Sequence, residues 1–147
     1  MAKKESEMDE VEALRKQLAE ARAPREAKQA QLEREREIAR LKQEIEDEPA
    51  IAAAVVEHGA IGDKIGVVHS DEGAIVVKRP KVAAWRRFSD GETVKGKDMR
   101  MLAKECLVYP SWSRFEAITE ARPAALEAVG LVIGRLAQAR DKEAAEK

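Results

Sequence analysis

Few side chains in this sequence have the types and the spacing that catalysis or metal binding requires. His58 and His69 lie eleven residues apart, one beside a glycine turn and one at the end of a predicted strand, and Cys106 follows far downstream. Metal sites and activated nucleophiles need such groups close together in the fold. The sequence therefore predicts no metal ion, no cofactor and no enzymatic activity.

Two further features resemble parts of a catalytic or phosphate-binding site but lack the sequence context that such a site needs. Cys106 shares an apolar stripe with Met99, Leu102 and Ala103, which predicts a small core residue rather than a nucleophile. As the only cysteine it cannot form an intramolecular disulfide. A Gly-Lys pair within residues 91–97 lacks the glycine spacing and the strand-to-helix context of a phosphate-binding loop.

The segment Trp85-Arg-Arg-Phe88 combines aromatic and basic side chains, as some nucleic-acid-binding proteins do. It lies within residues 74–104, where nine Lys and Arg oppose three Asp and Glu. Trp85 and Phe88 are three apart and share one helix face, so Arg86 and Arg87 point away from them. That spacing favours a short core helix, and nucleic-acid binding remains only the weaker alternative.

The elements that position these residues begin with a charged helical arm over residues 1–48. Its apolar side chains repeat at three and four, as in a coiled-coil seam: Val11, Leu14, Leu18 and Ala21, then Ile38, Leu41 and Ile45. Pro24 predicts a kink or break, and Arg25 and Lys28 fall where apolar residues should lie. The arm is either a solvated structural helix or a pairing device that can form homo-oligomers. Pro49 is expected to end it.

A linker with a short apolar helix is expected over residues 49–63. Two β-branched runs then span residues 64–69 and 74–78, and Gly73 in the turn between them suits positive φ. They predict one β-hairpin, which must pack on helices because an isolated hairpin is only marginally stable. A charged tail that frays is expected over residues 141–147.

A small bundle of short helices is expected to complete the domain at residues 64–140, so the fold class is mainly α. Pro80 begins one helix, a second runs over residues 97–108, and Pro123 begins the last. Ser111 can cap the helix between them, or Ser113 and Glu116 can form a capping box. The candidate partner-binding residues are Trp85, Arg86, Arg87, Phe88, Tyr109, Trp112, Phe115, Leu126, Val129, Ile133 and Leu136.

Composition limits the remaining possibilities. The 147 residues are 37% charged and 3% aromatic, which is too polar for a single globule of this length. No apolar run approaches the length of a membrane span, and the charged N-terminus lacks the apolar region of a signal peptide. A cytoplasmic protein is expected.

The order of several motifs resembles the tail assembly chaperones of tailed bacteriophages. The motifs are Val76-Val-Lys-Arg-Pro80, Trp85-Arg-Arg-Phe88, Cys106-Leu-Val-Tyr-Pro-Ser111, Phe115, and Pro123 ahead of a terminal helix. The resemblance covers roughly residues 59–137. The charged N-terminal arm is longer than the family pattern implies.

This resemblance implies a non-enzymatic viral protein that acts in the host cytoplasm. It would bind the long tape measure protein, with the C-terminal helices as the expected contact, and assist assembly of the tail tube protein. The alternative is a structural virion protein or coiled-coil adaptor that uses the arm to join an assembly. An exposed apolar groove rimmed by charge would be the expected binding site for a client helix.

Overall fold

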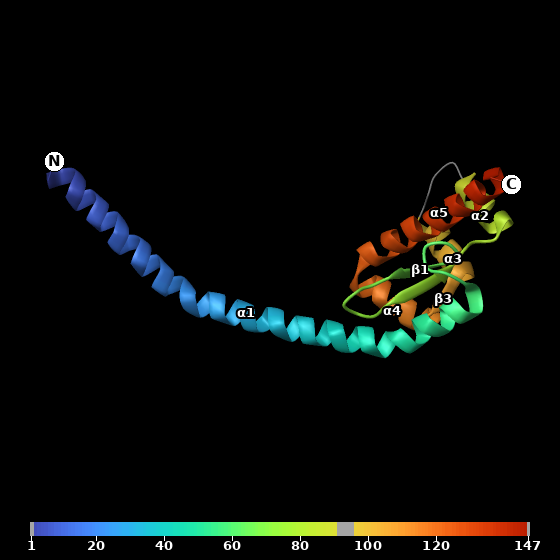
Figure 1. Ribbon diagram of the computed structural model, residues 1–147, viewed down its shortest axis with the longest axis horizontal. Coiled ribbons are helices and arrows are strands. Elements are labelled where there is room, and N and C mark those ends of the chain that lie inside the picture. Colours follow the sequence, from blue (N-terminus) through green and yellow to red (C-terminus); the bar gives the residue numbers. More distant parts are fainter. Residues whose placement is uncertain (1, 91–95, 147) are drawn as a thin grey trace. The chain divides into compact units, whose positions relative to one another are not determined.

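The computed structural model describes residues 2–90 and 96–146, and it confirms a mainly helical fold (Figure 1). The chain divides into two compact units, Met1–Arg40 and Leu41–Lys147. The elements are α1 (Ala2–His58), β1 (Ile65–Val68), β2 (Ile75–Lys78), α2 (Val82–Ser89), α3 (Gly96–Cys106), β3 (Leu107–Tyr109), α4 (Trp112–Ala121) and α5 (Pro123–Glu146).

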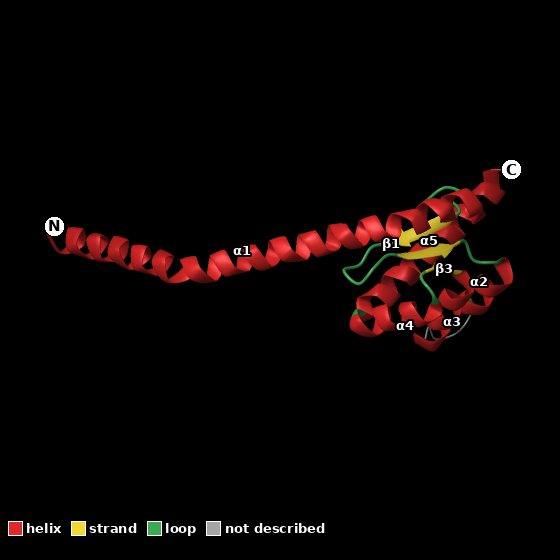
Figure 2. Ribbon diagram, turned by 90° about the horizontal axis from the view of Figure 1, so that it is seen from below, coloured by secondary structure: helices red, strands yellow, loops and turns green. Residues whose placement is uncertain are grey.

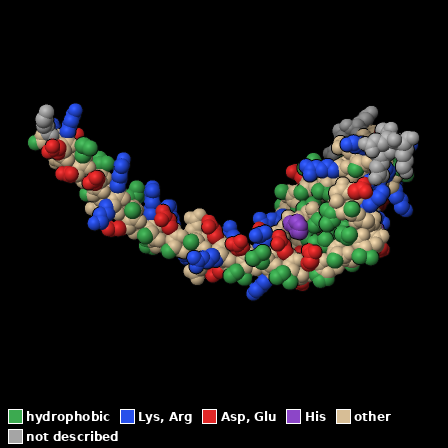
Figure 3. All heavy atoms as spheres, viewed as in Figure 1, with side chains coloured by type: hydrophobic (Ala, Val, Ile, Leu, Met, Phe, Trp, Pro, Cys, Tyr) green, Lys and Arg blue, Asp and Glu red, His purple; other side chains and the backbone are tan. Residues whose placement is uncertain are grey.

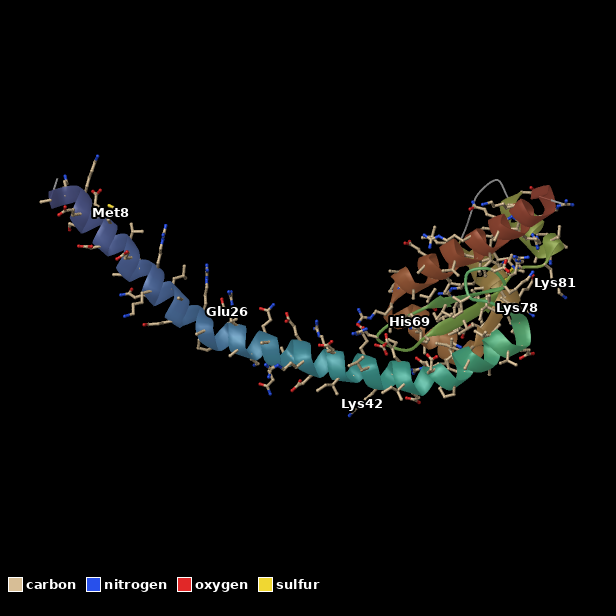
Figure 4. The ribbon with its side chains drawn as sticks, in the orientation of Figure 1. Met8, Glu26, Lys42, His69, Lys78 and Lys81 are labelled. Atoms are coloured by element: carbon tan, nitrogen blue, oxygen red, sulfur yellow. The ribbon has the colours of Figure 1, made fainter. Side chains whose placement is uncertain are left out.

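Helix α1 is longer than the prolines in its sequence suggest. It continues through Pro24, and its ribbon bends close to Glu26 (Figure 4). It also continues through Pro49, so neither the end of the arm there nor a separate short helix within residues 49–63 is found. Each proline removes one backbone donor. The flanking Ala, Glu, Gln, Lys and Arg are strong helix formers, and beyond Pro49 the helix also packs on the sheet.

The predicted hairpin is confirmed, and the sheet gains a strand that the sequence did not reveal. Strands β1 and β2 pair antiparallel, and Gly73 in the turn between them has a φ of +134°. Residues 107–109 form β3, which pairs antiparallel with the other edge of β2. The prediction that residues 97–108 form one helix was therefore wrong at its end, because α3 stops at Cys106.

The central strand β2 is buried on both faces, as its uninterrupted apolar sequence requires. Val76 packs with Ile51 and Ala54 of α1. Ile75 and Val77 point to the opposite face and join the core formed with α2, α3, α4 and α5. Figure 2 shows the strands in the middle of this unit with helices on both sides. The second unit is thus a three-layer fold.

Helix α5 lies close against β1 where Gly66 leaves room. A Cβ atom placed on Gly66 would lie 2.0 Å from Cγ1 of Val132. Gly130 and Gly134 of α5 receive side chains in the same way, from Met99 of α3 and Trp85 of α2. The two helix glycines therefore serve packing between helices.

Of the two capping arrangements that the sequence left open for α4, the first is present. Ser111 is the N-cap, and its Oγ accepts a hydrogen bond from the backbone N–H of Arg114 at 3.3 Å. Arg114 also donates to the carbonyl of Glu72, and Arg122, the C-cap of α4, pairs with Asp71, so α4 and its cap hold the hairpin turn. At the C-terminus, α5 continues to Glu146 where a frayed tail was expected.

No helix in residues 2–90 and 96–146 combines the length and the apolar character that a membrane span needs.

Candidate partner-binding surfaces

Four of the eleven candidate residues lie in the core and do not reach the surface. Phe115, Val129, Ile133 and Leu136 are each no more than 1% exposed. They form one apolar cluster with the inner face of the sheet. Their spacing on α4 and α5 therefore reflects packing within the unit, and a partner cannot contact them in this fold.

The aromatic residues of α2 are partly buried. The rings of Trp85 and Phe88 have centroids 5.6 Å apart, and both pack against the core. Trp85 lies over Gly134, so most of its role is to join α2 to α5. Arg86 and Arg87 are exposed, as the spacing predicted.

The basic residues around the start of α2 line a cavity of about 300 Å³. Lys78 and Lys81 lie close together there, at the end of β2 and just before α2 (Figure 4). Arg87 forms an ion pair with Glu105 at 3.3 Å. Arg79 forms one with Asp63 at 2.6 Å. Since two of these four cations already have acidic partners, the positive charge offered to a polyanion is smaller than the sequence suggests.

An open groove of about 630 Å³ lies among α3, α4 and α5, and we call it the α3–α5 groove. Its lining is Lys97, Arg100, Met101, Lys104, Trp112, Glu116 and Leu126. It brings together two of the predicted candidates, Trp112 and Leu126. The exposed Met101, which sequence reasoning did not single out, joins them. Met101 lies beside the apolar stripe of α3 rather than on it, so a pattern search for core residues passes over it.

The α3–α5 groove is lined by apolar and basic side chains. Trp112 stacks on the buried Phe115 with ring centroids 5.0 Å apart, which fixes the orientation of its ring. The Lys104 ammonium lies 5.5 Å from the Trp112 ring centroid, a cation–π arrangement. Three cations and one carboxylate line the groove together with its apolar residues, so the groove favours an apolar segment that carries acidic side chains.

A second exposed apolar surface follows the arm, in the unit Met1–Arg40. Val11 is 46% exposed, and Leu14 and Leu18 are similarly uncovered. Figure 3 shows hydrophobic side chains at intervals along this part of α1, between charged side chains of both signs. The spacing at three and four is that of a coiled-coil seam, as the sequence indicated.

Tyr109 contributes to neither surface, because it donates a hydrogen bond to a buried carboxylate. Asp47 is 2% exposed, and its Oδ1 accepts from the Tyr109 hydroxyl at 2.8 Å and from Gln43 Nε2 at 3.1 Å. Its Oδ2 accepts from the backbone N–H of Ala74 at 2.8 Å. The hydrogen bond from the Tyr109 hydroxyl to Asp47, followed by burial and the negative charge of Asp47, raises the pKa of that hydroxyl.

Sequence reasoning missed Asp47, although a signal was present. It lies four residues before Ile51, which is three before Ala54, so an acid occupies the apolar stripe of a helix. Buried carboxylates persist only where donors surround them. Asp47 therefore joins α1 to the start of β2 and the end of β3.

The residues considered for chemistry remain separate. Within residues 2–90 and 96–146 no three His, Cys, Asp or Glu side chains are grouped as a metal site would need. Cys106 is buried, as its place on the apolar stripe predicted, and burial raises the pKa of its thiol to about 11. The thiol is thus protonated at neutral pH, which is the opposite of an activated nucleophile.

Comparison with protein-family models, with curated proteins and with solved structures finds no match to this chain. The features that bear on function are therefore the residues and the geometry described above. Those features are two exposed apolar surfaces, the α3–α5 groove with its basic residues and the apolar row of the arm with charges of both signs.

Proposed function

We propose that this protein is a non-enzymatic assembly chaperone that holds an amphipathic helix of a long helical client in the α3–α5 groove. The motif order described above resembles phage tail assembly chaperones, and the client would then be the tape measure protein. In that role the protein would act in the cytoplasm of the infected host and assist assembly of the tail tube protein.

The observation that carries the proposal is the composition of the α3–α5 groove. Its lining offers Met101, Trp112 and Leu126 to a client, and Met101 is 55% exposed. Exposed apolar grooves with polar rims are typical of sites that bind amphipathic helices. The groove is open, which suits a client that must later be released into an assembly.

Two other functions have specific support. The exposed apolar row of the arm favours a coiled-coil adaptor or structural virion protein, and Lys78 and Lys81 favour nucleic-acid binding as the weaker choice. Mass spectrometry of purified particles separates chaperone from component, since abundant copies in mature virions contradict a chaperone role. A salt-dependent gel shift of DNA or RNA by the full chain would support the third function.

The binding test uses the full chain co-expressed with the long helical protein encoded by the adjacent reading frame. Affinity capture should recover the client with the wild-type chain. Met101→Glu should reduce recovery about 10-fold or more, because the substitution places a carboxylate among the apolar lining residues and removes a contact. Absence of a long helical protein in that frame would itself contradict the tape measure assignment.

Leu131→Glu is the matched control, since Leu131 is an apolar helix residue that is also more than half exposed but lies in a different groove of the same unit. It should leave recovery unchanged. If Leu131→Glu abolishes recovery while Met101→Glu does not, the client binds elsewhere and the assignment to the α3–α5 groove fails. Circular dichroism of both variants checks that the fold is intact.

A further inference from the structure

Residues 11–32 of α1 carry a heptad pattern with a charged interruption. The a and d positions, which we call the arm seam, hold Val11, Leu14, Leu18, Ala21, Arg25, Lys28 and Leu32. The larger apolar members are about half exposed, which is the exposure of a helix with no partner along that face. A two-stranded coiled coil would bury these apolar side chains. Arg25 and Lys28, however, interrupt the same row just before Leu32.

The charges that flank the arm seam are also positive. Arg15 and Arg22 occupy e positions, next to the seam. The acids of residues 11–32 are Glu12, Glu20 and Glu26, which occupy b and c positions on the far side of the helix. The seam-facing positions of this segment therefore hold four cations and no carboxylate, although the arm as a whole is slightly acidic.

A second copy of this chain is a poor partner for such a surface. In a parallel, in-register pair, Arg25 would face Arg25 and Lys28 would face Lys28 across the seam. In an antiparallel pair the e positions face one another, which brings Arg15 and Arg22 of the two copies together. Like charges at these positions oppose association in either orientation.

We propose that the arm seam binds a different chain, an amphipathic helix whose apolar stripe is interrupted by acidic residues opposite Arg25 and Lys28. Further acids on that helix would pair with Arg15 and Arg22. Charge complementarity at core and flanking positions is how coiled coils select partners. This is a second interaction surface, on the unit Met1–Arg40, and it does not depend on the proposed function of the α3–α5 groove.

The test measures binding of two synthetic helical peptides to the full-length chain by fluorescence anisotropy. Both peptides have three heptads with Leu at a and d. The acidic probe has Glu opposite Arg25 and Lys28 and at its e and g positions, and the basic probe has Lys at all of these. A shuffled acidic peptide of identical composition controls for attraction without a seam. The acidic probe should bind about 10-fold or more tightly than either other peptide.

Charge-reversal variants then test whether the arm seam causes the preference for the acidic probe. The double variant Arg25→Glu with Lys28→Glu should lose the acidic probe and gain the basic one. Its matched control is Arg34→Glu with Arg40→Glu, which reverses two charges outside residues 11–32 and should leave the preference unchanged. Added salt should weaken the acidic complex, since the selecting charges are near the surface.

If the arm seam instead binds a second copy of this chain, the measurements give a different result. Equal binding of the acidic and basic probes overturns the proposal, and so does a wild-type dimer in sedimentation velocity that Leu14→Lys converts to a monomer. Met101→Glu should leave the acidic probe bound. Failure of the α3–α5 groove as a client site is therefore distinguishable from failure of the arm seam.

Discussion

The buried carboxylate of Asp47 gives the sharpest test of the fold. Replacing it by Ala removes the acceptor for three donors: the Tyr109 hydroxyl, the Gln43 amide and the Ala74 N–H. The Ala74 N–H is buried with its residue, so water cannot easily replace the lost partner. The other two donors lie nearer the surface and can find water.

The expected loss in the free energy of unfolding follows from these different environments. An unsatisfied buried N–H costs about 1–3 kcal/mol, and a hydrogen bond to a charged group contributes about 1.5–3 kcal/mol. The desolvation of the carboxylate in the wild-type protein offsets part of this sum. We expect Asp47→Ala to destabilise the protein by about 2–4 kcal/mol. Asp47→Asn keeps an acceptor for Ala74 and should cost about half as much.

A double-mutant cycle isolates the link between helix and sheet. Tyr109→Phe alone should cost about 1–2 kcal/mol, because its ring stays partly exposed and only the hydroxyl contact is lost. Since the two residues share one hydrogen bond, the losses should not add, and the coupling free energy should be about 1 kcal/mol.

Urea unfolding followed by tryptophan fluorescence measures each value, with both tryptophans in the unit Leu41–Lys147. Glu46→Ala is the matched control, since it removes an exposed carboxylate from the same helix turn and should change stability by less than about 0.5 kcal/mol. If Asp47→Ala unfolds at the same urea concentration as Glu46→Ala with an unchanged slope, the reasoning about a buried acceptor is refuted.

Two further predictions concern packing and titration. Gly66→Ala should destabilise the protein by about 1–3 kcal/mol, because the added methyl meets the stiff side chain of Val132. Gly130→Ala should be close to neutral, because only the end of the flexible Met99 side chain opposes the methyl. Equal urea midpoints for the two variants would contradict this difference. Tyr109 is the only tyrosine, so ultraviolet absorbance should show its pKa above the ordinary value of about 10, and Asp47→Ala should lower that pKa towards it. Because the pKa of Tyr109 is higher in the folded than in the unfolded state, the stability contributed by its hydrogen bond to Asp47 is complete below about pH 10 and is lost as the pH rises through the folded-state pKa. If a Tyr109→Phe variant lost the same stability at alkaline pH as the wild type, this link would be contradicted.

Sequence patterns predicted the elements that interactions between neighbouring residues determine, such as turns and helix caps. The β-branched runs on either side of Gly73 gave the hairpin, and Ser111 gave the start of α4. Strand β3 was missed because residues 107–109 directly continue a helical stripe, and only pairing with β2 makes them extended. The prediction that α1 breaks at its prolines failed for the opposite reason, because a local signal was given too much weight. A proline costs a helix one hydrogen bond, which a long helix of strong formers tolerates.

The candidate site could be predicted only in part. Trp112 and Phe115 lie on one face of α4, and sequence spacing cannot show that one is exposed in a groove while the other is buried beneath it. The depth of each depends on α3 and α5, which come from other parts of the chain. Met101 enters the α3–α5 groove for the same reason. Asp47 could have been noticed as an acid on an apolar stripe, but its partners lie 27 and 62 residues away.

The burial of β2 on both faces also sets an order of events during synthesis. The residues that cover Val76, namely Ile51 and Ala54, leave the ribosome before the hairpin does, so this layer can close first. The face with Ile75 and Val77 has to wait for α3, α4 and α5. Until the last helix has been made, the nascent chain therefore exposes one apolar face of its sheet, and that interval is when a newborn copy is most open to aggregation.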